Sequence, residues 1–243
     1  MTERMRINIL ALLVLVSAVM PVQAAEREKT PFLPPLFRGV SAHFDLASPI
    51  MGLAAGSNVH NYEAMVDVSI YDRFFPCLEV GYTNVSHAVD EKSYKAQSPF
   101  FRLGMNMNLL KTVRDGKAQN IRNYAYVGVR YAFAPMTYSI GNIVMSDGYW
   151  GGETVIDYPA ETVYAGWAEI VGGVRIDFVA GFTMGWSVRI KALMHTSAES
   201  KDLLWYVPGF GKNSTTSFSF SYTVGYTFRT PATKKLMNID KDK

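Results

Sequence analysis

The sequence lacks the features on which several protein classes depend. It has one cysteine, Cys77, in 243 residues, so an intramolecular disulfide is impossible, and this cysteine lies too far from the start of the chain to carry a lipoprotein acyl group. After residue 24, no apolar run reaches the ~18 residues that indicate a transmembrane helix, although 49% of all residues are hydrophobic. The sequence therefore excludes a disulfide scaffold, a lipoprotein anchor and a helical membrane protein.

Motifs of enzyme and nucleotide chemistry are also missing. The chain contains no phosphate-binding loop, no metal-ligand spacing and no nucleophile elbow. Its formal net charge of +3 is too small to indicate a nucleic-acid partner. We therefore expect no metal, no cofactor and no nucleic acid.

The first 24 residues have the pattern of a secretory signal peptide. Arg4 and Arg6 precede an apolar run over residues 7–20, and small residues follow it up to Ala24 and Ala25. A basic start, a short apolar segment and small closing residues predict export and cleavage after one of these alanines. The alternative, a membrane anchor, would need about 20 apolar residues.

The rest of the chain divides by composition into a short lead-in, one domain and a tail. Residues 25–36 combine charges with three prolines, and we expect them to be extended because proline removes a ladder donor. No linker interrupts residues 37–229, which we interpret as a single domain. Residues 230–243 form a charged C-terminal tail.

The strongest secondary-structure signal is an unbroken alternation over residues 217–229. A period of two places every large apolar side chain on one face of an extended strand and the small or polar ones on the other. Seven further segments alternate in the same way, near 37–46, 62–70, 76–83, 101–109, 124–133, 164–176 and 182–191. The apolar face in 217–229 consists of Phe218, Phe220, Tyr222, Val224, Tyr226 and Phe228.

The connections between these eight segments alternate in length. Long ones are expected at 47–61, 86–97, 135–161 and 196–215, and short ones at 72–73, 111–120 and 177–181. Antiparallel strands with long loops at one end and short turns at the other are typical of a transmembrane β-barrel. The predicted fold class is therefore all-β, an eight-stranded antiparallel up-and-down transmembrane β-barrel, with the long connections outside the cell.

Glycine and charge indicate which face lines the interior. Seven glycines lie on the polar face, and eight strands leave room inside only for tightly fitted side chains. The apolar face has no charge between the strand ends, and aromatic residues gather near both of its ends, as in membrane girdles. We therefore predict a lumen filled by a salt-bridged network that includes Asp67, Glu79, Arg102, Arg130, Glu169, Arg175, Arg189 and Lys191. A soluble barrel with an apolar interior is the alternative.

In this pattern, residues 37–229 resemble the small eight-stranded outer-membrane proteins of Gram-negative bacteria, of the OmpX and OmpA-barrel type, and more closely the uncharacterised barrels of Bacteroides-like bacteria. The resemblance implies an outer-membrane location, contact with outer-membrane lipid and insertion by the barrel-assembly machinery. The last strand resembles the signal that this machinery reads, although in the family that signal usually ends the chain. The matching positions are Tyr222, Val224, Tyr226 and Phe228.

One pair of residues suggests an enzyme. His195 and Ser197 resemble the His and Ser, two apart on a strand, of lipid A deacylase barrels, and a histidine can activate a serine hydroxyl. Both residues fall on the lumen side by strand parity, which disfavours attack on a membrane lipid. We therefore predict no enzymatic activity and no catalytic residue.

The long connections offer a second functional hypothesis. Tyr149 and Trp150 in one loop and Trp205 and Tyr206 in another could contact a surface ligand. Packing of the two loops against each other is the simpler account. We therefore expect a structural or surface-interaction role, with a narrow channel and a lipid A-modifying enzyme as alternatives.

Overall fold

The computed structural model describes residues 36–54, 58–89, 92–110, 113–114, 117–118, 123–147, 152–179, 181–197 and 204–231. The predicted signal peptide, nearly all of the lead-in and most of the charged tail therefore lie outside the described residues. Within them, no helix has the length and apolar character needed to cross a bilayer.

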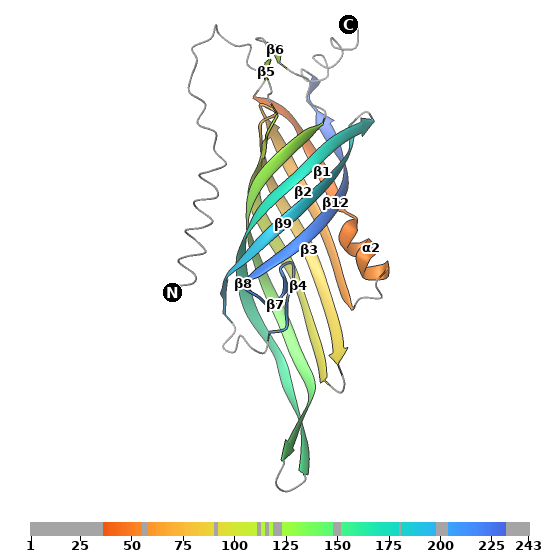
Figure 1. Ribbon diagram of the computed structural model, residues 1–243, viewed down its shortest axis with the longest axis vertical. Helices are drawn as coiled ribbons and strands as arrows, with labels where there is room; N and C mark the ends of the chain where they lie inside the picture. The colour runs from red at the N-terminus through yellow and green to blue at the C-terminus, as the bar shows by residue number, and fades with distance from the viewer. Residues whose placement is uncertain are drawn as a thin grey trace.

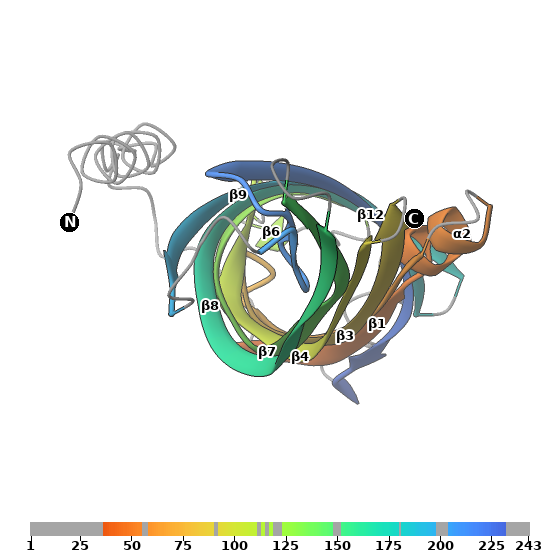
Figure 2. The same cartoon turned by 90° about the horizontal axis from the view of Figure 1, so that it is seen from below.

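Eight antiparallel strands close into a barrel in the order β1-β12-β9-β8-β7-β4-β3-β2 (Figures 1 and 2). This confirms the predicted all-β, eight-stranded barrel. The pairing of β1 with both β2 and β12 closes the ring. The strands are β1 Phe37–Asp45, β2 Val59–Ile70, β3 Phe74–Val89, β4 Lys92–Asn108, β7 Tyr124–Asp147, β8 Gly152–Val179, β9 Phe182–Thr196 and β12 Thr216–Arg229.

The two faces of the wall follow the alternation in the sequence. Along β9, side chains are exposed and buried in strict turn from Phe182 to Lys191. The exposed ones are large and apolar, whereas the buried ones are polar, glycine or charged, so the apolar face lies outside. This excludes the alternative of an apolar lumen. The outward members of β9 are Phe182, Met184, Trp186, Val188 and Ile190.

Two connections that the sequence predicts as loops are continuations of strands. β3 and β4 remain paired from Phe74 and Met107 up to Val89 and Lys92, and β7 and β8 form a hairpin that extends well beyond the barrel (Figure 1). The expected loops at 86–97 and 135–161 are therefore wrong. The extensions keep the two-residue period, because Tyr94 and Ala96 are buried while Lys95 and Gln97 are exposed.

The remaining described elements are short. A helix, α2 Ala47–Ala54, follows β1 and lies outside the ring (Figure 2). Two small hairpins, β5 Val113–Arg114 with β6 Lys117–Ala118 and β10 Tyr206–Val207 with β11 Gly211–Lys212, complete the fold. We call the end of the barrel with the β7–β8 hairpin the loop end, and the end with the β2–β3 turn and both ends of the barrel domain the turn end.

Candidate functional site

The centre of the lumen holds a network of buried charges built around Glu79 on β3. This carboxylate is 1% exposed and lies 2.5 Å from Arg189, 2.8 Å from Arg130 and 3.3 Å from Arg102. The three guanidinium groups come from β9, β7 and β4. One acidic side chain thus connects strands on opposite sides of the barrel through charge-assisted hydrogen bonds.

Arg102 and Glu169 extend the network toward the loop end. Arg102 lies 2.6 Å from Glu63 and 2.8 Å from Glu169, and Glu169 lies 3.4 Å from Arg189. The indole Nε1 of Trp167 donates to Glu169 at 2.7 Å. Because these groups are almost completely buried, their charges are compensated by one another rather than by bulk water.

Glycines opposite the large charged side chains provide the room that the network needs. A Cβ on Gly104 would lie 2.4 Å from the Arg130 side chain, and a Cβ on Gly128 would lie 2.8 Å from the same guanidinium group. A side chain at either position would clash with Arg130 and also with the Val129 carbonyl oxygen or the Asn106 side chain. The glycines of the polar face therefore belong to the lumen packing.

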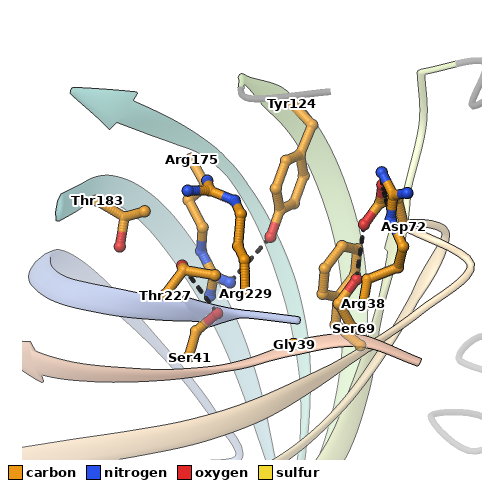
Figure 3. A pocket seen from close by; sticks show the side chains of 11 residues that line it. Arg38, Gly39, Ser41, Ser69, Asp72, Tyr124, Arg175, Thr183, Thr227 and Arg229 are labelled. Carbon is orange, nitrogen blue, oxygen red and sulfur yellow. Dashed lines mark hydrogen bonds and ion pairs between the residues drawn. The ribbon is translucent and has the colours of Figure 1, made fainter. Parts of the chain in front are cut away.

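Toward the turn end, Arg175 connects the charges to a layer of aromatic rings. It lies 2.7 Å from Asp67 and donates to the Tyr124 hydroxyl at 2.9 Å. His43 lies 3.6 Å from the same Asp67 carboxylate, and Phe75 stacks on Tyr124. Arg175 and Tyr124 border a small pocket of about 40 Å³ at the end of the barrel (Figure 3), a volume that accommodates water but no larger ligand.

The segment 204–215, which the sequence places in an external loop, instead enters the loop end of the lumen. Gly209 accepts hydrogen bonds through its carbonyl oxygen from Arg102 at 2.9 Å and from Lys191 at 2.7 Å. Its backbone N–H donates to Thr83 at 3.2 Å. Figure 2 looks along the barrel from this end and shows the segment across the opening. We call residues 204–215 the plug.

The plug is held by an apolar cluster as well as by these hydrogen bonds. Phe210 is 1% exposed and makes an edge contact with Trp167, and Phe100 is completely buried beside Gly209. The cluster also includes Val85, Ala96, Met136 and Val163 from the extended parts of β3, β4, β7 and β8. The extensions are therefore ordered by the plug that they enclose.

The predicted loop-contact residues have different positions. Trp205 is half-buried, stacks on His87 at 4.3 Å and makes an edge contact with Tyr94. The Tyr94 hydroxyl donates to the carbonyl oxygen of Tyr206 at 2.9 Å, and burial raises the pKa of the Tyr206 phenol to about 12. Both plug residues thus contact the barrel. Tyr149 and Trp150 lie outside the described residues.

The lumen contains more groups than the predicted network. Strand parity also assigns His43, Asp45 and Glu63 to the polar face, and of these Glu63 is a direct partner of Arg102 and His43 lies beside Asp67. Lys191, a member of the predicted network, contacts the carbonyl oxygens of the plug and no carboxylate among the described residues. Asp45 caps α2 through Ala47 N and Ser48 N instead of pairing across the lumen. Its strand parity revealed only that it faces inward.

A bulge changes the orientation of the suspected catalytic pair. The register of β8 and β9 shifts between Gly166 opposite His195 and Trp167 opposite Leu193. His195 is therefore exposed and lies over Gly166 near the hydroxyl of the outward-facing Tyr131, so its predicted lumen orientation is wrong. Ser197 Oγ accepts a hydrogen bond from the Tyr164 backbone N–H at 2.8 Å, and no hydrogen bond joins Ser197 to His195 among the described residues.

The four residues of the predicted assembly signal share the outer face of β12. Tyr222 stacks with Trp186 of β9 at 6.0 Å, and Tyr226 makes edge contacts with Phe182 and Phe228. Val224 pairs with Phe44 of β1 in register. These side chains form part of the apolar outer wall near the closing seam. No group of three or more metal-ligating side chains occurs in the part of the chain that the structure describes.

Comparison with known proteins gives a family and a distant structural likeness. A family model described as "Domain of unknown function (DUF6048)" matches residues 2–235. No curated protein matches the sequence. Among solved structures, the crystal structure of Acinetobacter baumannii CarO2 aligns with 80% of this chain and 99% of that chain, at 12% identity and a TM-score of 0.31. A likeness this low supports no statement about function.

Proposed function

We propose that this chain, which belongs to the family described as "Domain of unknown function (DUF6048)", is an integral outer-membrane β-barrel with a closed lumen. In this proposal the protein acts through the surface that it presents at the loop end. The observation that carries the proposal is the inversion of an ordinary soluble fold: large apolar side chains cover the outside while charges fill the inside.

The outer apolar surface has the height of a membrane-spanning band. The outward side chains of β12 run from Phe218 to Phe228. At about 3.3 Å per residue and a tilt of ~40°, these ten steps correspond to roughly 25 Å, which matches the apolar band of outer-membrane barrels. Aromatic contacts mark both levels: Phe133 stacks with Tyr164 at 5.8 Å toward the loop end, and Tyr226 contacts Phe182 at 5.2 Å toward the turn end.

The filled interior argues against a pore. A solute moving along the barrel axis would have to displace both the apolar plug around Phe210 and the buried ion pairs of Glu79. Breaking such a buried pair costs about 3 to 5 kcal/mol, and aqueous channels are typical of barrels with ~16 strands. Planar-bilayer recordings should therefore show no large, long-lived conductance steps.

A surface role is supported by the projecting hairpin of β7 and β8. Val155, Ile156 and Tyr158 are 60%, 38% and 46% exposed on it, and beyond Gly141 the two strands pair only with each other within the described part of the chain. Asp157 accepts a hydrogen bond from Asn142 N at 2.7 Å where the chain takes a left-handed conformation. The hairpin therefore presents apolar side chains and free strand edges, which are suited to pairing with another protein.

The orientation and location can be tested in intact cells. We expect an epitope tag inserted between β7 and β8 to be accessible to antibody, and a tag inserted between β4 and β7 to be inaccessible until the envelope is permeabilised. The reverse pattern would overturn the orientation. A chain recovered only in the soluble fraction, or one with no heat-modifiable gel mobility, would refute the membrane barrel itself.

One observation supports a second candidate, a lipid-modifying enzyme, because the bulge turns His195 outward. The serine would still need a histidine within hydrogen-bond reach to become a nucleophile. We expect no deacylated lipid A from cells that express the protein. Deacylation that disappears in His195→Ala and Ser197→Ala, with normal gel mobility, would assign the chain to the enzymes instead.

A further inference from the structure

The wall of the barrel is interrupted between β2 and β12 at the loop-end level. β1 ends at Asp45, whose partner on β12 is Thr223, and the last β1–β2 pair is Phe44 with Ala64. Among the described strands, residues 60–63 of β2 therefore pair only with β3, and residues 216–221 of β12 pair only with β9. Because neighbouring strands lie about 4.8 Å apart, the loss of one strand leaves roughly 10 Å between β2 and β12.

A cavity of about 420 Å³ lies in this interruption. It is lined by Phe218 and Phe220 from the outer face of β12 and also by Ser217, Ser219 and Ser221 from its inner face. A single cavity can contact both faces of one strand only by passing around the free edge of that strand. The cavity is therefore a lateral connection between the outer surface and the lumen, and its volume lies within the roughly 300 to 1,000 Å³ of small-molecule sites.

Helix α2 borders the outer side of this opening. Asp45 caps its first turn and accepts a hydrogen bond from Tyr222 N at 2.9 Å, which ties the start of the helix to β12. A Cβ at Gly52 would lie 3.0 Å from the carbonyl oxygen of Val59, so the helix also lies close against β2. The exposed side chains of the helix are apolar: Ile50, Met51 and Leu53 are 56%, 61% and 76% exposed.

The inner end of the cavity is polar and is lined by one cation, Lys191, and by one carboxylate, Glu63, which is already paired with Arg102 at 2.6 Å. Lys191 is 4% exposed and lines the cavity, and its ammonium group donates to the carbonyl oxygens of Gly209 and Phe210. An ammonium has three N–H donors, so one is left for a ligand. No hydrogen bond of the Ser217, Ser219 or Ser221 hydroxyl to another described residue is found, and these groups add further donors at the same place.

The charges around Lys191 favour an anion. Among the described residues, the ion-paired centre of the lumen contains five cations and four carboxylates, and each of these carboxylates has an arginine within hydrogen-bond distance. The buried Asp45 carboxylate at the edge of the opening is occupied by the backbone N–H groups of Ala47, Ser48 and Tyr222. Lys191 is the one cation of the five with no carboxylate partner. The cations are Arg102, Arg130, Arg175, Arg189 and Lys191, and the carboxylates are Glu63, Asp67, Glu79 and Glu169.

We propose that this lateral cavity binds one membrane-derived, single-chain amphiphile with an anionic head, of the fatty-acid class. The head pairs with Lys191 and the serine hydroxyls of β12, and the hydrocarbon chain leaves between α2 and Phe220 into the bilayer. The inference rests on the proposed function, because the occupant comes from the membrane that surrounds the barrel.

The test uses the full-length protein in nanodiscs of zwitterionic phosphatidylcholine and a fluorescent fatty acid, cis-parinaric acid, as the probe. Heat-modifiable mobility is measured first on every sample. We expect saturable binding with one probe per barrel and at least tenfold weaker binding of the corresponding uncharged alcohol, because the charge-assisted hydrogen bond to Lys191 is lost. Equal affinity for the acid and the alcohol would refute the proposal that the ligand has an anionic head.

Two variants, each with a matched control, locate the site. Lys191→Met should weaken binding of the acid by about tenfold or more and leave the alcohol unchanged, whereas Lys95→Met, a charge loss on the exposed face of β4, should change neither. Ser219→Phe fills the cavity and should abolish binding of both probes, whereas Ser86→Phe on the exposed face of β3 should not.

The outcomes separate this inference from the proposed function. A barrel with normal heat-modifiable mobility and no saturable binding, or binding that neither Lys191→Met nor Ser219→Phe alters, refutes the lateral site and leaves the membrane barrel intact. If Lys191→Met does not fold, the Ser219→Phe result decides. Failure of the wild-type chain to insert into nanodiscs would refute the proposed function first.

Discussion

Replacing Glu79 by glutamine should strongly destabilise the barrel. The carboxylate accepts hydrogen bonds from Arg189, Arg130 and Arg102 at 2.5, 2.8 and 3.3 Å. An amide of the same shape has one acceptor oxygen and one NH₂ donor group, so at least one guanidinium group would face another donor. Loss of the negative charge also leaves the arginines with an uncompensated buried charge.

The expected magnitude follows from this geometry. Removing one partner of a buried ion pair costs about 3 to 5 kcal/mol, and here the same carboxylate serves three arginines, so we expect the upper part of that range. The control is Glu161→Gln on the β7–β8 hairpin, because Glu161 is exposed and, among the described residues, accepts only from the Tyr138 hydroxyl at 2.9 Å. An amide oxygen can take over that role, so little change is expected.

The assay is equilibrium unfolding in urea, with the folded fraction measured by heat-modifiable mobility in lipid vesicles. Glu79→Gln should unfold at a clearly lower urea concentration than the wild type and Glu161→Gln. The difference should persist at high salt, because buried pairs are screened much less than exposed ones. Coincident unfolding curves for Glu79→Gln and the wild type would refute the reasoning, since they would mean that water compensates the arginines.

Three further predictions follow from single contacts. Gly81→Ala should lower the unfolding midpoint by the equivalent of about 1 to 3 kcal/mol, because the new Cβ would overlap the Phe100 ring. Gly172→Ala is the control, because it has open space around it and should leave the midpoint unchanged. Equal midpoints for the two variants would contradict the packing. The thiol of Cys77, 3% exposed in the lumen, should react with a maleimide only after unfolding, and rapid labelling of the folded barrel would show an open interior. Asp45→Ala removes the cap of α2 and should cost about 1 kcal/mol, seen as faster proteolysis between β1 and β2; unchanged cleavage would show that the cap does not hold the helix.

The sequence by itself determined the strands and their two faces. A period of two is a local property, so the alternation in residues 217–229 already identified Phe220 and Phe228 as members of one face and Ser219 and Ser221 as members of the other. Small and charged residues on one face, in a barrel of eight strands, are enough to place that face inside. For this reason Glu79, Arg102 and Arg130 could be assigned to the lumen without coordinates.

The partners within the lumen could not be deduced in the same way. Arg189 and Glu79 are 110 positions apart in sequence and belong to strands β9 and β3, which are not neighbours in the sheet. Their contact depends on the register of every strand between them. A bulge of one residue is enough to turn a side chain from one face of the strand to the other, as it does at His195.

The plug, the strand extensions and the lateral opening were decided by the tertiary structure alone. Residues 204–215 carry no periodic signal, and Phe210 has a binding place only when Trp167 and Phe100 come together in the closed barrel. The polar stretch around residues 86–97 resembles a loop until the plug supplies the apolar surface on which Tyr94 and Ala96 pack. Such contacts link segments that are remote in the sequence, and their free energy appears only when the chain has closed. Local alternation therefore sets the wall of the barrel, whereas long-range packing sets what fills it and where it opens.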